Sequence, residues 1–487
     1  MDVDPTVGFV QDVPETLMLG DSTPAESRAA ASAMPDAADS ASAEAVMLAA
    51  PATSTTTADI AMTMSLAPAS AAGDGSSIGS DSPAQDSAVS LAPATIAADA
   101  APSITSDAPA TQQVVFIDPS AAEPGDGSAA HPFSSWIFVS LVAGNIYLQK
   151  AGTVLDGPLV LHGEGTEAAP ILIGAYGTGA APVVRGSIMI ENSAHLTLSG
   201  FDVQGSQLAG IAVQHGSHNI IIVGNNIHDN SVGVWFSSDS GGGNLLINNT
   251  ISGNAIHGIA FNKTDHRANP TLVADNVVTD NGSHGIEINA NGIVVLGNAF
   301  SGNGHSISGS SGIHVYGGVG QADGFGNDNI IVSNTITDTH EAGQGYDGNG
   351  IQLDQFTARN IVVSNTASGN DGAGIILFDS AMNIVIENTL TGNALDRTDS
   401  RHWQAELILA SDDRAAPDLT ASNLIMGNII TPRDADVLGI WVDTLTADNA
   451  NQISSNSIAA MSGDVGLNMA FLSTSPVAGG GDDIWGG

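Results

Sequence analysis

One short phrase recurs through residues 219–393 and constrains the fold more than any other feature of the chain. Each copy has an asparagine, a second polar residue five positions later, and then a glycine followed by isoleucine or valine. The first asparagines are Asn225, Asn249, Asn276, Asn298, Asn334, Asn365 and Asn388, and the glycines are Gly210, Gly233, Gly258, Gly285, Gly312, Gly350 and Gly374. Spacings of 22 to 24 residues between neighbouring copies, lengthened by inserts elsewhere, indicate a stacked array of small units.

Within each copy the apolar residues form short runs, such as Ile220 to Val223, that are too short for helices and rich in β-branched side chains. Glycine and asparagine separate the runs, and both tolerate the left-handed backbone of a sharp corner. One coil cannot bury its own apolar edge, whereas stacked coils share a continuous core. Leucine-rich repeats have a similar period but need leucines at fixed offsets, which this chain lacks. The repeat therefore predicts an all-β fold, a right-handed parallel β-helix.

The same pattern predicts where individual side chains lie. The repeated asparagines are expected to stack at one corner and to hydrogen-bond along the stack. The apolar residues that follow them are expected to share one interior: Ile227, Ile251, Val278 and Phe300.

Composition divides the 487 residues into three parts. Residues 1–112 are dominated by Ala, Ser, Thr, Asp and Pro and predict a disordered tail, because such a segment buries too little apolar area to offset chain entropy. Residues 113–470 are expected to form the β-helix. Residues 471–487 form a Gly/Asp-rich tail that resembles the start of a Ca²⁺-binding nonapeptide repeat.

Charge excludes several partners. Asp and Glu outnumber Lys and Arg by 51 to 10, and the net charge of −41 repels nucleic acid and anionic membranes. No apolar run is long enough to cross a membrane, and the first residues do not form a cleaved secretory signal. We expect an extracellular or cell-surface protein exported without such a signal. The absence of cysteine indicates no compartment, and the sequence predicts no oligomeric state.

The opening of the ordered region is similar to that of a known group of proteins. A strand from Val114 to Ile117 leads into Gly125–Ser128 and then His131–Phe133, with Gly144-Asn145 where Gly-Asp is usual. This run resembles the start of secreted polysaccharide lyases, mannuronan C5-epimerases and related right-handed β-helix proteins. The resemblance extends to about Met461 and implies a β-helix that acts on, or binds, a polysaccharide.

Alternation along each strand predicts which side chains face outward from the stack. Aligned on the Gly-Ile element, the first outward row is Ala212, Trp235, Ala260, Glu287, His314, Gln352 and Ile376. The second outward row is Gln214, Ser237, Asn262, Asn289, Tyr316, Asp354 and Phe378. Both rows change from small or apolar residues to ionisable ones in the same middle coils, which makes this patch the candidate site.

We assign expected roles to the patch and its surroundings. The expected catalytic groups are Tyr316, His314, Glu287, Asp354 and Lys263. The expected substrate-binding groups are Asn262, Asn289, His284, His257, Gln352, Arg267 and Trp235. Because oxygen ligands suit Ca²⁺, a calcium ion is expected to bind Asp347, Asp354 and Glu287. The chain has no zinc-ligand spacing, P-loop or dinucleotide fingerprint.

Three function classes remain open at this point. In the first, a lyase or C5-epimerase acts on a uronate-containing polysaccharide, with Tyr316 and His314 as acid and base and Lys263 or Arg267 neutralising the carboxylate. The epimerases carry a Tyr-Gly-Phe-Asp-Pro-His-Asp motif, and this chain has only Tyr316-Gly317-Gly318, so the resemblance extends to the tyrosine alone.

The second class is an inverting glycoside hydrolase. Glu287 and Asp354 are expected two coils apart, which separates their backbones by about 9.6 Å and suits a carboxylate pair with a water between them. The third class is a non-catalytic polysaccharide-binding or adhesin-type surface protein, which the long Ala/Ser/Asp tail favours.

Overall fold

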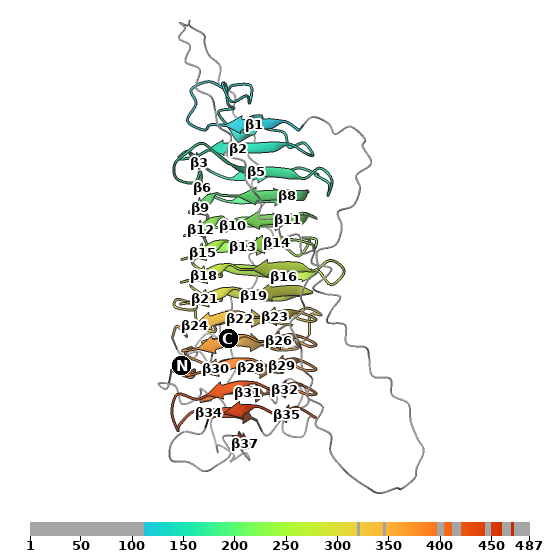
Figure 1. Cartoon of the computed structure of the whole chain (residues 1–487), viewed down its shortest axis with the longest axis vertical. Helices are drawn as coiled ribbons and strands as arrows, with labels where there is room; N and C mark the ends of the chain where they lie inside the picture. Colours follow the sequence, from blue (N-terminus) through green and yellow to red (C-terminus); the bar gives the residue numbers. More distant parts are fainter. Residues whose placement is uncertain are drawn as a thin grey trace, which may run out of the picture. The chain divides into compact units, whose positions relative to one another are not determined.

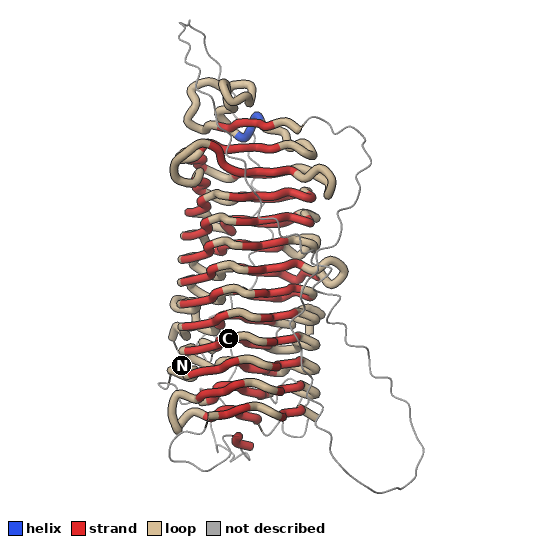
Figure 2. The backbone as a smooth tube through the Cα atoms, in the orientation of Figure 1, coloured by secondary structure: helices blue, strands red, loops and turns tan. Residues whose placement is uncertain are grey.

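The computed structural model describes residues 112–318, 322–343, 347–396, 404–411, 420–443, 450–459 and, by backbone alone, 469–471. Apart from their residues nearest the β-helix, the two predicted tails (residues 1–112 and 471–487) lie outside the described part. Within it, parallel strands coil into a right-handed β-helix, which confirms the predicted fold (Figures 1 and 2). The described part contains no helix with the length and hydropathy needed to cross a membrane.

Each coil contributes one strand to each of three parallel sheets, called A, B and C here. Sheet A has 13 strands: β1 (Val114–Ile117), β2 (Ile146–Lys150), β5 (Ile171–Tyr176), β8 (Ala194–Ser199), β11 (His218–Val223), β14 (Leu245–Ile247), β17 (Thr271–Ala274), β20 (Ile293–Leu296), β23 (Ile330–Val332), β26 (Ile361–Val363), β29 (Ile384–Ile386), β32 (Leu424–Met426) and β35 (Gln452–Ser454). A 3₁₀ turn, η2 (Trp136–Phe138), precedes β2.

Sheets B and C have 12 strands each. Sheet B contains β3 (Val154–Asp156), β6 (Val183–Arg185), β9 (Asp202–Gln204), β12 (Asn226–His228), β15 (Thr250–Ser252), β18 (Val277–Thr279), β21 (Ala299–Ser301), β24 (Thr335–Thr337), β27 (Thr366–Ser368), β30 (Thr389–Thr391), β33 (Ile429–Thr431) and β36 (Ser457–Ile458). Sheet C contains β4 (Leu159–Leu161), β7 (Ile188–Glu191), β10 (Ala209–Gln214), β13 (Val232–Phe236), β16 (Ile259–Asp265), β19 (Ile286–Asn291), β22 (Ser311–Val315), β25 (Asn349–Leu353), β28 (Ile375–Phe378), β31 (Ala405–Ala410), β34 (Leu438–Val442) and β37 (Met469–Phe471).

The repeated asparagines form a hydrogen-bonded ladder at the corner between sheets A and B, as predicted. The side-chain amide of Asn225 donates to Oδ1 of Asn249 (3.1 Å), and Asn249 donates to Asn276 (3.0 Å). The same Oδ1 atoms accept the backbone N–H of the preceding asparagine, at 2.9 Å for Asn225. Each asparagine therefore supplies the hydrogen-bond partners that a tight corner leaves unsatisfied.

Two further ladders support the other corners. Between sheets B and C, Asn230 donates to Asn254 and Asn254 to Asn281, at 3.2 and 2.9 Å. Between sheets C and A, a ladder that sequence reasoning missed includes Asn329, Asn360, Asn383 and Asn423. All three corners of the coil are thus held by stacked side-chain amides.

The interior is apolar, as the alternation predicts. Ile227, Ile251 and Val278 have no exposed surface and Phe300 is 1% exposed. They belong to one continuous core that extends from Ile117 to Val442. Burial of this shared core is the main favourable term for a solenoid, because no coil has a core of its own.

The glycine of the Gly-Ile element is required for space. A Cβ atom on Gly285 would lie 2.6 Å from the carbonyl oxygen of Gly312 and 2.7 Å from the Phe300 ring. The inner residues and the corner asparagine of the next coil leave no volume there.

Glu406 is the exception to this rule, since it occupies the glycine position in β31. Its side chain turns into the corner and accepts hydrogen bonds from the backbone N–H and the side-chain amide of Asn393 (3.0 and 2.6 Å). A carboxylate therefore takes the acceptor role of the next asparagine and ends the ladder between sheets B and C. Burial raises the pKa of Glu406 to about 7.

This burial predicts a loss of stability at neutral pH. Between pH 4.5 and about 7, Glu406 is ionised in the unfolded chain but still protonated in the fold, so unfolding releases a proton and stability falls as pH rises. The shift corresponds to a loss of about 3 kcal/mol over this range. Glu406→Gln removes this titration. The unfolding free energy of the variant minus that of the wild type should therefore increase as pH rises. A difference between the two proteins that is the same at pH 4.5 and well above 7 would contradict this prediction.

Candidate functional site

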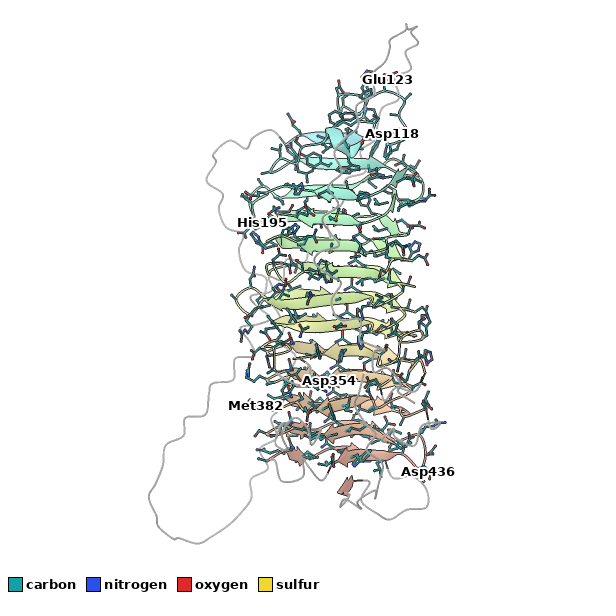
Figure 3. All side chains as sticks on the ribbon, turned by 180° about the vertical axis from the view of Figure 1, so that it is seen from behind. Asp118, Glu123, His195, Asp354, Met382 and Asp436 are labelled. Atoms are coloured by element: carbon teal, nitrogen blue, oxygen red, sulfur yellow. The ribbon has the colours of Figure 1, made fainter. Side chains whose placement is uncertain are left out.

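The register of sheet C places the predicted outward residues in rows. Ala260 is opposite Glu287, Glu287 is opposite His314, and His314 is opposite Gln352. In the second row, Asn262 is opposite Asn289. The backbone N–H of Asp354 donates to the carbonyl of Val315, which places it beside Tyr316 in the same row. Figure 3 labels Asp354 on these middle coils.

Four aromatic rings stack along this face. His257 and His284 precede their Gly-Ile elements on consecutive coils, and their rings are 5.1 Å apart and nearly parallel, at 7°. The rings of His284 and His314 are 4.3 Å apart, and those of His314 and Tyr316 are 5.8 Å apart. A column of three imidazoles and a phenol thus runs along the middle coils of sheet C.

Two carboxylates pair with the outer imidazoles of this column. Nε2 of His257 lies 2.9 Å from Oε2 of Glu287, and Nε2 of His314 lies 3.2 Å from Oδ2 of Asp354. The His314 side chain is 9% exposed, whereas the Glu287 side chain is 27% exposed. The imidazole of His314 is therefore largely buried, whereas the carboxylate of Glu287 is partly exposed to solvent.

These contacts separate the proton affinities of the site. Burial would raise the pKa of Glu287, but the imidazoles of His257 and His284 hold it well below the usual range. Burial would lower the pKa of His314, but Asp354 and Glu287 raise it above its ordinary value. The pKa of His284 is well below its ordinary value, because the ring is buried between two other imidazoles. Burial and the carboxylates of Asp354 and Glu341 raise the pKa of Asp347 to about 7.

Lys263 lies at an irregularity in strand β16. Asn262 pairs with Asn289 and Thr264 pairs with Ala290, so Lys263 is an extra residue between them, with a positive φ of 49°. Such a bulge redirects a side chain, and here it places an exposed lysine beside the second outward row. Among the described residues, no carboxylate lies within ion-pair distance of Lys263. Every other described Lys and Arg is paired: Lys150 with Asp118, Arg185 with Asp156, Arg267 with Asp265 and Asp328, Arg359 with Asp328, and Arg433 with Asp434.

The structure does not bring two of the expected binding residues to the column. The guanidinium of Arg267 lies 3.2 Å from Asp328 and also pairs with Asp265, so its charge is already neutralised. Trp235 is 5% exposed and packs with Ala212 and Ala260, so it presents no open face for stacking on a sugar.

Two further polar residues of the rows, Gln352 and Asn289, are held by hydrogen bonds within the protein. Oε1 of Gln352 accepts hydrogen bonds from Ser311 Oγ (2.6 Å) and from the amide of Asn349 (3.0 Å). The amide of Asn289 donates to the carbonyl of Tyr316 (2.9 Å) and to Asp323 (3.1 Å). These hydrogen bonds hold the side-chain amides of Gln352 and Asn289 in fixed orientations.

The three expected calcium ligands do not form one group among the described residues. The set whose ligand atoms lie within 4.8 Å of one another is His257, His284 and Glu287. Glu287 faces His257 and Asp354 faces His314, so each carboxylate already has an imidazole partner. Asp347 is not within this distance of Glu287 and a third ligand. Binding of calcium by Asp347, Asp354 and Glu287 stays a prediction.

The set of His257, His284 and Glu287 also fits a transition metal poorly. Nδ1 of His284 accepts the backbone N–H of Ser311 at 2.9 Å, so the proton of the neutral ring is on Nε2, the atom that faces Glu287. A metal ion bound between His284 and Glu287 would need a lone pair on Nε2, which carries the proton here. A metal-bound histidine also donates an N–H from its second ring nitrogen, whereas Nδ1 of His284 accepts one. We therefore assign no metal to this set.

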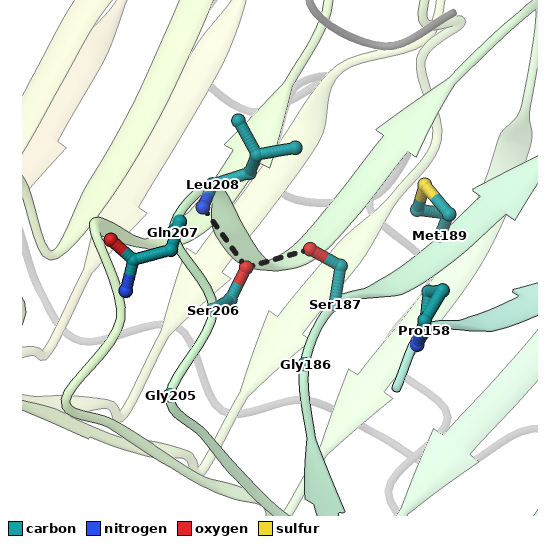
Figure 4. A pocket seen from close by; sticks show the side chains of 8 residues that line it. All are labelled: Pro158, Gly186, Ser187, Met189, Gly205, Ser206, Gln207 and Leu208. Atoms are coloured by element: carbon teal, nitrogen blue, oxygen red, sulfur yellow. Dashed lines mark hydrogen bonds between the residues drawn. The ribbon is translucent and has the colours of Figure 1, made fainter. Parts of the chain in front are cut away.

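A separate pocket lies nearer the start of sheet C, with a cavity of about 290 Å³ (Figure 4). It is lined by Pro158, Gly186, Ser187, Met189, Gly205, Ser206, Gln207 and Leu208. Ser187 and Ser206 hydrogen-bond to each other at 2.8 Å, and Ser206 also accepts the N–H of Leu208 at 3.1 Å. The lining has no titratable side chain and therefore offers no general acid or base.

Comparison with known proteins agrees with the fold. Residues 182–323 match the family model for the right handed beta helix region. A GH136 lacto-N-biosidase from Eubacterium ramulus aligns with a TM-score of 0.51 and 15% identity over 72% of this chain and 68% of that one. The A-module of a mannuronan C-5 epimerase from Azotobacter vinelandii aligns with a TM-score of 0.50 and 15% identity over 68% of this chain and 90% of that one. No curated protein matches the chain.

The class of protein that these observations define is a right-handed parallel β-helix. At 15% identity the likeness establishes the fold alone. The reaction has to be argued from the residues of this chain.

Proposed function

We propose that this protein is a carbohydrate-active enzyme, a lyase or C5-epimerase that abstracts the proton next to the carboxylate of a uronate-containing polysaccharide. The observation that carries the proposal is Lys263. In a chain with a net charge of −41, this exposed ammonium group has no carboxylate partner in the described part and directly follows Asn262, which is in register with Asn289 in the second outward row. A substrate carboxylate would supply the missing partner.

The neighbouring groups support the proton transfers of such a reaction. Removing a proton next to a carboxylate requires a cation on the carboxylate, a base and an acid. We assign the cation to Lys263 and the acid to His314, because the neighbouring carboxylates of Asp354 and Glu287 raise its pKa and so favour the protonated ring. Tyr316, whose ring is 5.8 Å from that of His314, is the proposed proton acceptor: as its phenolate it takes the C5 proton while the C5–H bond breaks, which reverses the roles expected from the sequence.

The same proposal covers the setting of the reaction. A polysaccharide is the proposed partner, since the outward face of sheet C presents its charged groups along consecutive coils. We propose that the protein works outside the cell or at its surface, where such polymers occur. Screening the purified protein against alginate, pectate and glycosaminoglycans tests this substrate class.

Lys263→Met is expected to lower kcat/KM on a uronate polysaccharide by about 100-fold, because the variant leaves the substrate carboxylate without its counter-charge. The matched control is Lys150→Met, which removes the only other lysine, one that is paired with Asp118 at 2.7 Å and lies near the start of the β-helix. Initial rates on the same polymer measure both variants. Equal rates for Lys263→Met and the wild type would remove Lys263 from the mechanism.

Hydrolysis is the second candidate, and one observation favours it. Glu287 has a pKa held well below its usual range, whereas the pKa of Asp347 is raised to about 7. Two carboxyl groups with separated pKa values are the requirement for a base and an acid in a glycosidase. In this reading Asp347 replaces Asp354 as the acid, because Asp354 is paired with His314. Release of new reducing ends without an unsaturated uronate would select this reaction.

Calcium is expected to raise the melting temperature, since an ion that binds folded carboxylates more tightly than unfolded ones stabilises the fold. The proposed ligands are Asp347, Asp354 and Glu287. Thermal unfolding in the presence of Ca²⁺, of Mg²⁺ as a control, and of a chelator measures the effect. A melting temperature that is the same under all three conditions would exclude a calcium site.

A further inference from the structure

His284 differs from the two histidines on either side of it. His257 and His314 each have a carboxylate within 3.2 Å, whereas Nε2 of His284 lies 3.9 Å from its nearest carboxylate oxygen, Oε2 of Glu287. Its side chain is 7% exposed. What distinguishes it is the other nitrogen, because Nδ1 accepts the backbone N–H of Ser311 at 2.9 Å.

That hydrogen bond determines where the ring carries its proton. A backbone N–H can only donate, so Nδ1 of His284 must present its lone pair. The neutral ring then carries its hydrogen on Nε2, on the side of Glu287. A doubly protonated ring would place two donors, Nδ1–H and the Ser311 N–H, against each other in a buried position, which is costly.

The carboxylate of Glu287 receives both neighbouring imidazoles on one oxygen. Nε2 of His257 and Nε2 of His284 lie 2.9 and 3.9 Å from the same Oε2. Oε1 accepts no hydrogen bond within the described residues. His257 therefore contacts Oε2 of the carboxylate directly, whereas His284 approaches the same oxygen from beyond hydrogen-bond distance.

We propose that His284 is a positioning residue that acts through Glu287: the Ser311 N–H locks its ring as the Nε2–H tautomer, and this N–H orients the carboxylate so that Oε1 faces the substrate. This role of His284 rests on the proposed function in one respect, because that function supplies the substrate that Glu287 would contact. It holds whether Glu287 binds a sugar hydroxyl or activates water. The 3.9 Å contact is expected to shorten when substrate excludes solvent.

Two substitutions separate this role from simple packing. His284→Gln places an amide N–H near the position of Nε2, so it keeps the donor to Glu287 and loses the acceptor for Ser311. His284→Asn places an amide oxygen near the position of Nδ1, so it keeps the acceptor and loses the donor. If His284 acts through Glu287, His284→Gln should retain activity within about tenfold of the wild type and His284→Asn should lose about 100-fold. Equal losses, or the opposite order, would overturn the proposal.

A second measurement needs no substrate. Nitrogen-15 NMR of the histidine-labelled full chain at neutral pH should show one histidine signal with the Nε2–H tautomer that disappears in His284→Asn. An Nδ1–H tautomer for this signal, or a change to it on titration with Zn²⁺, would contradict the assignment. If the tautomer is as proposed but no glycan is turned over, the proposed function fails while the geometry of His284 stands.

Discussion

His314→Gln is expected to reduce turnover on a uronate polysaccharide by about 100-fold or more, the usual cost of losing a general acid. Glutamine keeps an N–H that can donate to Asp354, so the carboxylate stays satisfied and the melting temperature should change little. The variant lacks the titrating proton of the imidazole, whose pKa the neighbouring carboxylates of Asp354 and Glu287 raise. Steady-state rates and thermal unfolding, measured on the same preparation, separate the two effects.

His228 offers a matched control for this substitution. It pairs with Asp202 and Asp229 at 3.1 and 2.7 Å, but it lies in sheet B, on another face of the coil. His228→Gln should therefore leave turnover unchanged. A His314→Gln protein with wild-type rates, or equal losses in both variants, would move the chemistry away from the imidazole column.

Ile251→Asp is expected to destabilise the β-helix by more than about 4 kcal/mol, because a carboxylate in a dry core has no partner. Thr250→Asp is the control, since its position is adjacent on β15 but its side chain is exposed. An outward substitution of this kind changes stability by only about 0.5 kcal/mol. Denaturant unfolding of the two variants measures the difference that a shift of one residue makes.

Similar unfolding free energies for the two variants would mean that the inward and outward positions had been exchanged. Because side chains alternate along a strand, such an error of one residue would also reverse both outward rows of sheet C. The stability measurement therefore tests the alignment on which the candidate site depends.

The fold was predictable because the repeat keeps its asparagines and apolar residues in a regular order. Asn225, Asn249 and Asn276 recur with apolar residues at fixed offsets, and the structure stacks them as expected. The ladder between sheets C and A escaped detection because its early members are not all asparagine. Thr271 takes the position after Asn244, and Ile293 supplies only its backbone N–H to Asn329.

The site was predictable only in part, because the alternation along a strand predicts which face a side chain lies on but not which residues it contacts. It placed Glu287 and His314 on one face, yet it did not reveal that Arg267 is neutralised by Asp328, which is 61 residues away in sequence. The placement of Lys263 by a one-residue bulge depends on the pairing of β16 with β19, which the sequence pattern does not reveal. The bond from Ser311 to His284 comes from a backbone N–H and leaves no signal in the sequence.

We propose above all that this protein breaks the C5–H bond of a uronate residue. Proton NMR of a uronate polysaccharide incubated with the protein in D₂O measures this directly. A lyase removes the C5 proton and an epimerase replaces it with deuterium, so either reaction should erase the C5 proton signal with the wild type and much more slowly with Lys263→Met. New reducing ends with the C5 proton intact, or an unchanged spectrum with every uronate polymer, would contradict the proposed reaction.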